Sequence, residues 1–204
     1  GGVNSMNDIT HICLFDIPML CSIPGLIYLA PTTCEEYFAM LAWAIRQDCK
    51  PIALRVPTGG VVHSDAPVDE DYGYRASYRV AHRGSTVAII AAGSFYQKGE
   101  AVRALLAEQG IDATLINPRY LNEVDAETLD SLKPDHRLVV TLEDGCRDGG
   151  FGERIAAYYG TSDMKVMVGG VKKGLYDRFD TQQLMADNRL LDSQIVEDIV
   201  RVIG

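Results

Sequence analysis

The chain has 204 residues, of which 47% are hydrophobic and 23% charged, the ordinary balance of a folded globular protein with room for one large or two small domains. Acidic residues outnumber basic ones by 28 to 19, and the resulting net charge of −9 argues against a nucleic-acid-binding protein, whose phosphate contacts need Lys and Arg. No apolar run approaches the ~18 residues of a membrane span, and the N-terminus lacks the basic-then-apolar order of a signal peptide. We therefore expect a cytoplasmic protein.

The cysteines and histidines form no recognisable framework. The cysteines are odd in number, irregularly spaced and mostly in apolar surroundings, which favours reduced, buried thiols over disulfides or a zinc site. None of the histidines stands at metal-ligand spacing from a cysteine or carboxylate, so we expect no metal to be bound by this chain alone. These residues are Cys13, Cys21, Cys34, Cys49, Cys146, His11, His63, His82 and His136.

The first 60 residues are predicted to be only part of a domain. Residues 1–16 show no strand pattern, and short strands are predicted at 27–30 and 52–56. Between them a helix is predicted, with Thr33 as its N-cap and Glu36 as the capping-box partner. Its predicted buried face consists of Tyr37, Met40, Leu41, Ala44 and Ile45. Two strands and one helix cannot enclose a core, because even a domain of about 60 residues is marginally stable.

The rest of the chain is predicted to be a linker followed by a second domain. Residues 61–74 are rich in acidic residues with little periodicity, which indicates an exposed interdomain linker before a domain at 75–204. Strands are predicted at 75–82, 86–92, 113–116, 138–143 and 165–168, and helices at 93–110, 125–131, 151–159, 181–185 and 193–203. The β-α-β-α-β-α-β order from residue 86 predicts an α/β fold with a mostly parallel sheet and right-handed crossovers.

The stretch 138–160 reads as strand, glycine turn and helix. Its turn lacks the Lys-Ser/Thr of a phosphate loop and the Gly-x-Gly-x-x-Gly spacing of a dinucleotide fingerprint. Its glycines are therefore predicted to let the helix pack closely against the sheet or a partner subunit. Glu143 and Asp144 end the strand, and as neighbours their side chains should diverge, so we expect them to cap or shape the turn rather than act as an acid/base pair.

A polar loop before the first strand holds the best acid/base candidate. Asp8, His11 and Asp16 lie close together there, and loops rich in titratable groups often carry catalytic residues. His11 is the candidate, and the alternative is a loop histidine bonded to a backbone carbonyl.

Arg55 is the second candidate, because it lies near the end of an apolar strand and a guanidinium there needs an anionic partner. It either contacts a substrate or forms a structural salt bridge to an acid such as Asp16 or Glu36.

Short motifs along nearly the whole chain resemble one known family. They are Thr-His-Ile-Cys-Leu-Phe-Asp at 10–16, Cys-Ser-Ile-Pro at 21–24, Ala-Pro at 30–31, Ala-Leu-Arg-Val-Pro-Thr-Gly at 53–59, Asn-Pro-Arg-Tyr at 117–120, Thr-Leu-Glu-Asp at 141–144 and Gly-Leu-Tyr-Asp-Arg-Phe at 174–179. Any one match is weak. The ordered set resembles the 1-deoxy-D-xylulose-5-phosphate synthases, thiamine-diphosphate enzymes of the transketolase superfamily.

The resemblance implies a domain assignment and a chemistry. Residues 1–60 would be the latter half of the pyrimidine-binding domain, and residues 75–204 the transketolase C-terminal domain. The complete enzyme would use thiamine diphosphate and magnesium to decarboxylate pyruvate and add the two-carbon unit to an aldehyde.

The family's Gly-Asp-Gly…Asn cofactor motif and its activating glutamate have no match here. The chain is therefore expected to be a fragment or one subunit of a split enzyme, binding no cofactor and inactive by itself, and needing an N-terminal region or partner subunit. The same resemblance implies a homodimer.

The resemblance also assigns roles to residues. His11 matches the family histidine that faces the substrate near the cofactor, and Asp8 is one position away from the acid of the family's Asp-Gly-x-Thr-His, so both are predicted site residues together with Arg55. Thr58 stands where the family has the arginine that binds the acceptor's phosphate, and Cys21 replaces another arginine. A hydroxyl cannot replace the bidentate hold of a guanidinium on phosphate, so the acceptor stays open.

Three alternatives remain. The chain could belong to a split transketolase or be the β subunit of a 2-oxo acid dehydrogenase. It could be a non-catalytic dimerisation or regulatory module, an alternative that Thr58 and Cys21 favour. A free-standing nucleotide-binding domain is the third.

Overall fold

A five-stranded sheet forms the centre of the computed structural model, which describes residues 1–3, 8, 11–57, 60–73 and 75–204. The strand order is β3-β5-β4-β6-β7, and only the edge pair β3 and β5 is antiparallel. The strands are β3 (Arg79–His82), β4 (Thr86–Ala91), β5 (Thr114–Asn117), β6 (His136–Cys146) and β7 (Lys165–Val171). The predicted fold class, α/β with a mostly parallel sheet, is confirmed.

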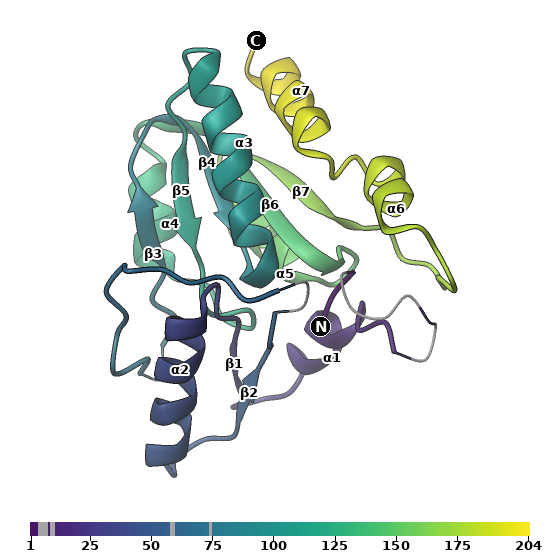
Figure 1. Cartoon of the computed structure of the whole chain (residues 1–204). Coiled ribbons are helices and arrows are strands. Elements are labelled where there is room, and N and C mark those ends of the chain that lie inside the picture. The colour runs from purple at the N-terminus through teal and green to yellow at the C-terminus, as the bar shows by residue number, and fades with distance from the viewer. Residues whose placement is uncertain (4–7, 9–10, 58–59, 74) are drawn as a thin grey trace.

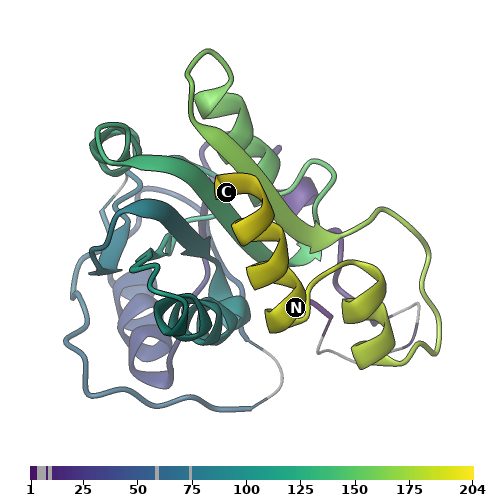
Figure 2. The same cartoon turned by 90° about the horizontal axis from the view of Figure 1, so that it is seen from above.

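Helices cover both faces of this sheet (Figures 1 and 2). The covering elements are η1 (Gly93–Phe95), α3 (Tyr96–Glu108), α4 (Ala126–Leu132), α5 (Phe151–Tyr159), α6 (Thr181–Asp187) and α7 (Asp192–Ile203). One face packs against α3, α6 and α7, and the other against α4 and α5. The central strands β4 and β6 are therefore apolar on both faces, and residues 87–91 and 138–142 are buried throughout. None of the described helices is long and apolar enough to cross a membrane.

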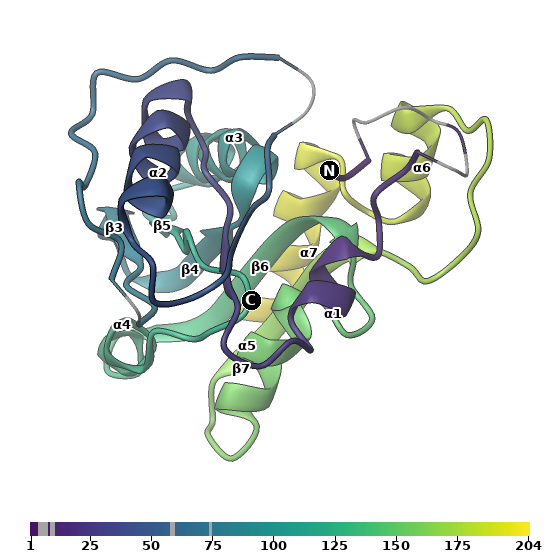
Figure 3. The ribbon, with the colours of Figure 1, turned by 90° about the horizontal axis from the view of Figure 1, so that it is seen from below.

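The N-terminal segment lies on the side of the sheet where β4 and β6 end (Figure 3). It contains α1 (Asp16–Leu20), β1 (Ile27–Leu29), α2 (Cys34–Arg46) and β2 (Ile52–Leu54), and β1 and β2 form a parallel two-stranded sheet. Tyr28 accepts a backbone hydrogen bond from Leu121 N at 2.9 Å, and Ala30 N donates to Arg119 O at 2.7 Å. The small sheet is thus hydrogen-bonded to the segment that follows β5.

A separate cluster of buried side chains supports this small sheet. Its members come from β1, α2 and two later segments, and they are Ile27, Leu29, Met40, Trp43, Tyr72 and Tyr120. The described residues 60–73, predicted to be an exposed linker, form no helix or strand, but Tyr72 within them is buried and Asp69 forms an ion pair with Arg119. The segment is therefore anchored at these two points.

The predicted buried face of α2 is partly wrong. Ile45 is 76% exposed, whereas Trp43 and Glu36 are buried. Apolar residues lie on both sides of this helix, so the pattern alone did not fix which side packs. Thr33 Oγ1 accepts from Glu36 N at 3.2 Å, which confirms the cap, but the Glu36 carboxylate turns to Thr32 and Asn117 instead of returning to the Thr33 backbone.

Gly152 shows how closely α5 packs against the sheet. A Cβ atom built there would lie 2.4 Å from Thr141 Oγ1 and 2.5 Å from Val168 Cγ1. The prediction that glycine allows a close approach is confirmed at this position, because any side chain would overlap two strands.

We expect Gly152→Ala to lower the free energy of unfolding by about 1–3 kcal/mol, the usual cost of overpacking a close-packed core. Urea denaturation measures the loss. Gly160→Ala at the end of the same helix is the control, since its Cβ would meet only backbone atoms of its own helix, and it should change stability by less than about 1 kcal/mol. Equal losses in both variants would contradict the assigned role of Gly152.

Candidate functional site

Arg55 lies where the N-terminal segment meets the large sheet. It directly follows β2, and its side chain is 3% exposed. Its Nε donates to Asp16 Oδ2 at 2.7 Å, and its Nη1 forms an ion pair with Asp144. Asp16 begins α1, and Asp144 lies near the end of β6. One guanidinium therefore neutralises carboxylates from two elements that are far apart in the sequence.

Two hydroxyl groups complete this cluster. Tyr28 OH donates to Asp16 Oδ2 at 2.9 Å, and Ser94 Oγ donates to Asp144 Oδ2 at 2.5 Å. Burial raises the pKa of Tyr28, and the nearby Asp16 raises it further, so the phenol keeps its proton. Burial opposes the charge on Arg55, but the carboxylates of Asp144 and Asp16 outweigh this effect and raise the pKa of Arg55 above its ordinary value.

These contacts test the predicted ion-pair partners of Arg55. The ion pair with Asp16 was one of the expected alternatives and is present. The other suggested partner, Glu36, bonds Thr32 and Asn117 instead, and Asp144 was not foreseen as a partner. Contact between Arg55 and a substrate stays a prediction.

Glu143 has a different task from its neighbour Asp144. Its side chain is buried, with Oε2 accepting from Phe151 N at 3.0 Å and Oε1 from Gly152 N at 2.8 Å. It therefore caps the first turn of α5, as predicted, whereas the same prediction for Asp144 is wrong, because that carboxylate pairs with Arg55. Burial raises the pKa of Glu143 to about 8, although the two backbone hydrogen bonds act in the opposite direction.

The loop that carries His11 is attached to the same end of β6. Cys146 N donates to Leu14 O at 2.7 Å, and Gly2 N donates to Cys13 O at 3.0 Å. His11 Nδ1 lies 3.9 Å from Asp8 Oδ1, with side-chain exposures of 60% and 47%. The two predicted site residues are thus neighbours at the surface. Thr10 and Thr58, which belong to the motifs, lie outside the described residues.

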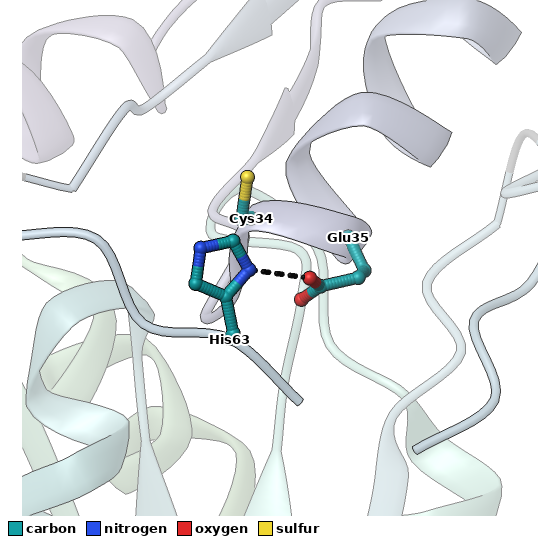
Figure 4. A group of neighbouring side chains, drawn as sticks. All are labelled: Cys34, Glu35 and His63. Atoms are coloured by element: carbon teal, nitrogen blue, oxygen red, sulfur yellow. Dashed lines mark hydrogen bonds and ion pairs between the residues drawn. The ribbon is translucent and has the colours of Figure 1, made fainter. Parts of the chain in front are cut away.

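Cys34, Glu35 and His63 also come together, although their spacing in the sequence did not predict it (Figure 4). His63 Nδ1 lies 2.7 Å from Glu35 Oε1, and one ligand atom from each of the three side chains lies within 4.8 Å of the other two. Cys34 and Glu35 are the first two residues of α2, whereas His63 lies in the segment 60–73. Only the fold brings them close, so no short motif could have revealed the group.

Comparison with known proteins identifies a domain that takes up about half of the chain. Residues 76–176 match the family described as the C-terminal domain of transketolase. The chain carries a transketolase C-terminal domain. Over more of its length it resembles the C-terminal part of 1-deoxy-D-xylulose-5-phosphate synthases, with 35% identity to that of Clostridium acetobutylicum across 84% of this chain and 32% identity to that of Crocosphaera subtropica across 97%.

Solved transketolase structures share the fold. One described as a split-gene transketolase, an inactive β4 tetramer, superposes with a TM-score of 0.78 at 21% identity over 96% of this chain. Transketolase from Pichia stipitis superposes with a TM-score of 0.74 at 13% identity over 99%. The chain spans only 27–32% of the two synthases and 62% and 29% of these two solved chains.

We expect Arg55→Ala to lower the free energy of unfolding of this chain by about 3–5 kcal/mol, because it leaves the buried carboxylate of Asp144 and the 16% exposed carboxylate of Asp16 without a counter-charge. Chemical denaturation measures the change. Arg83→Ala is the control, since Arg83 pairs with Asp135 at a site where both side chains are more than 40% exposed, and it should cost no more than about 1 kcal/mol. Similar losses in the two variants would show that the Arg55 cluster is not a structural link.

The cap of α5 predicts a pH dependence. The pKa of Glu143 is raised from 4.5 to about 8 in the folded state, so between these values the native transketolase-type domain keeps a proton that the unfolded chain releases. The contribution of this group to stability is therefore lost as the pH rises from about 4.5 to about 8.

Glu143→Gln removes the titration, so we expect the free energy of unfolding of the variant to fall less steeply than that of the wild type across this window. Urea denaturation at a series of pH values measures both profiles. Glu127→Gln, which changes an exposed carboxylate in α4, should follow the wild type. Parallel profiles for Glu143→Gln and the wild type would refute the raised pKa.

Proposed function

We propose that the chain supplies the C-terminal part of a thiamine-diphosphate-dependent transferase of the 1-deoxy-D-xylulose-5-phosphate synthase type. In the complete enzyme, pyruvate would be decarboxylated and its two-carbon unit added to an aldehyde. The observation that carries this proposal is the similarity to the C-terminal part of these synthases along 84–97% of the chain. The proposed class of reaction is inferred from the similarity to those relatives.

The described residues do not by themselves fit magnesium diphosphate. Magnesium takes oxygen ligands in near-octahedral geometry. The candidate metal-ligand group found among the described residues, Cys34 with Glu35 and His63, contains a thiol and an imidazole instead. We therefore assign the hold on the cofactor to an N-terminal region or partner subunit, and derive no step through the cofactor in this chain.

His11 is the residue of this chain that we propose for the chemistry. An imidazole can donate a hydrogen bond to an oxygen that gains negative charge, or carry a proton during carbon-carbon bond formation. His11 is 60% exposed in the isolated chain, so in the active assembly another part of the enzyme would cover it and exclude water. Its neighbour Asp8 lies 3.9 Å away and could orient the ring.

The assembly is proposed to contain this chain twice, as a homodimer, together with the cofactor-binding region. The split-gene transketolase with the same fold supports a division of labour between chains, because its β chains alone are described as an inactive tetramer. A chain of this kind would therefore be inactive until it joins its partner.

We expect His11→Ala, measured in the complete assembly, to lower kcat for the reaction of pyruvate with an aldehyde about 10²–10⁴-fold, the usual contribution of a general acid or base. His82→Ala is the control, since His82 lies on the edge strand β3, paired with Asp112. It should leave kcat unchanged. Normal turnover in the His11 variant would refute the assignment of His11.

One observation favours the alternative of a non-catalytic module. Cys21 stands where the family has an arginine, its Sγ donates to Leu121 O at 3.3 Å, and burial raises its pKa to about 11. A neutral thiol therefore replaces a cation at this position. Calorimetry of thiamine diphosphate with the chain mixed with its cofactor-binding region distinguishes the two functions, because the module predicts no binding and the transferase predicts binding that needs magnesium.

A further inference from the structure

Three side chains with different metal-binding atoms meet beside the start of α2 (Figure 4). The Cys34 sulfur, a Glu35 carboxylate oxygen and a ring nitrogen of His63 lie within 4.8 Å of one another. Cys34 and Glu35 belong to the N-terminal segment and His63 to the segment 60–73, and the group plays no part in the Arg55 cluster or in the role proposed for His11.

Two hydrogen bonds, each donated by a backbone N–H group, hold the two segments of this group together. Cys34 N donates to Val62 O at 2.8 Å, and Ser64 N donates to Glu35 Oε2 at 3.0 Å. These two bonds lie on either side of His63. The position of His63 beside the helix is therefore fixed by one main-chain bond and by the Glu35 carboxylate, which accepts from Ser64 N and lies 2.7 Å from His63.

We propose that Cys34, Glu35 and His63 bind a divalent transition metal ion of the zinc class. Thiolate, imidazole and carboxylate are the ligands that zinc takes in proteins, and three protein ligands leave a fourth position for water. Magnesium and calcium prefer oxygen ligands alone and would not select this set. A thiolate and a carboxylate together also neutralise the two charges of the ion.

The side chains need only a small movement to reach binding distance. In a tetrahedral zinc site the ligand atoms lie roughly 3.3–3.8 Å apart, so the present group would close by about 1 Å. Glu35 is 37% exposed and His63 70% exposed, and exposed side chains can change rotamer at little cost. Glu35 Oε1 would exchange its contact with His63 for the metal, while Oε2 keeps its hydrogen bond from Ser64 N.

The site would lie at the edge of a pocket. Cys34 and Val62 line a cavity of about 440 Å³, together with Tyr37, Phe38 and Pro57. Of the three proposed ligands, Cys34 lines this cavity and His63 lines a neighbouring one of about 330 Å³.

Cobalt(II) titration of the full, reduced chain tests the proposal, because a thiolate bound to cobalt gives a charge-transfer band in the near ultraviolet and a tetrahedral site gives strong visible bands. We expect one cobalt ion per chain, displaced by one equivalent of zinc. Cys34→Ser should abolish the charge-transfer band, and His63→Ala should weaken binding about ten-fold or more.

Two control variants change a cysteine and a histidine that lie outside the proposed metal site. Cys49 is an exposed thiol with Asp48 Oδ1 at 3.4 Å, and His82 lies 2.6 Å from a carboxylate oxygen of Asp112, but neither belongs to a group of three ligands among the residues that the structure describes. Cys49→Ser and His82→Ala should bind cobalt as the wild type does. Circular dichroism confirms that each variant is folded.

Alkylation provides a second measurement that does not depend on any variant. Zinc should protect Cys34 from iodoacetamide and leave Cys49 reactive. The proposal fails if the wild type shows no charge-transfer band, if the band persists in Cys34→Ser, if the control variants lose it equally, or if zinc leaves Cys34 unprotected.

Discussion

The contact of Arg55 with Asp16 and Asp144 is the interaction on which the arrangement of the two parts of this protein depends. Charges buried at an interface are costly unless they are paired, and here each partner comes from a different element. The N-terminal segment can therefore take its place only when the end of β6 is formed. The geometry of the His11 loop follows, because Leu14 in the same loop is bonded to Cys146, two residues after Asp144.

Residues near the end of β6 make contacts on both faces of the sheet. Successive side chains of a strand point to opposite faces, so Glu143 reaches the start of α5 while Asp144 reaches Arg55. The strand thus positions a helix on one side and the N-terminal segment on the other. This explains why two adjacent acids, which look alike in the sequence, do unrelated work.

Local signals in the sequence predicted most of the fold and little of the contacts between distant segments. The bounds of α5 were predicted correctly because glycines flank an apolar stripe, and the order of strands and helices predicted the sheet. The partner of Arg55 across 89 positions was missed, because no spacing rule connects a strand end to a residue so far along the chain. Proximity of His63 to Cys34 was missed for the same reason. The exposed Ile45 shows that apolar pattern alone cannot choose between two sides of a helix.

The shared core of the small sheet has a consequence for how the chain folds during synthesis. Residues 1–57 leave the ribosome before residues 60–204 do, yet Leu29 and Met40 pack against Tyr120, and Arg55 needs Asp144. Nascent N-terminal segments usually fold first when they form a domain of their own. Here residues 1–57 cannot complete their contacts until β6 has emerged, so their apolar side chains stay accessible to chaperones during the synthesis of the residues up to the end of β6.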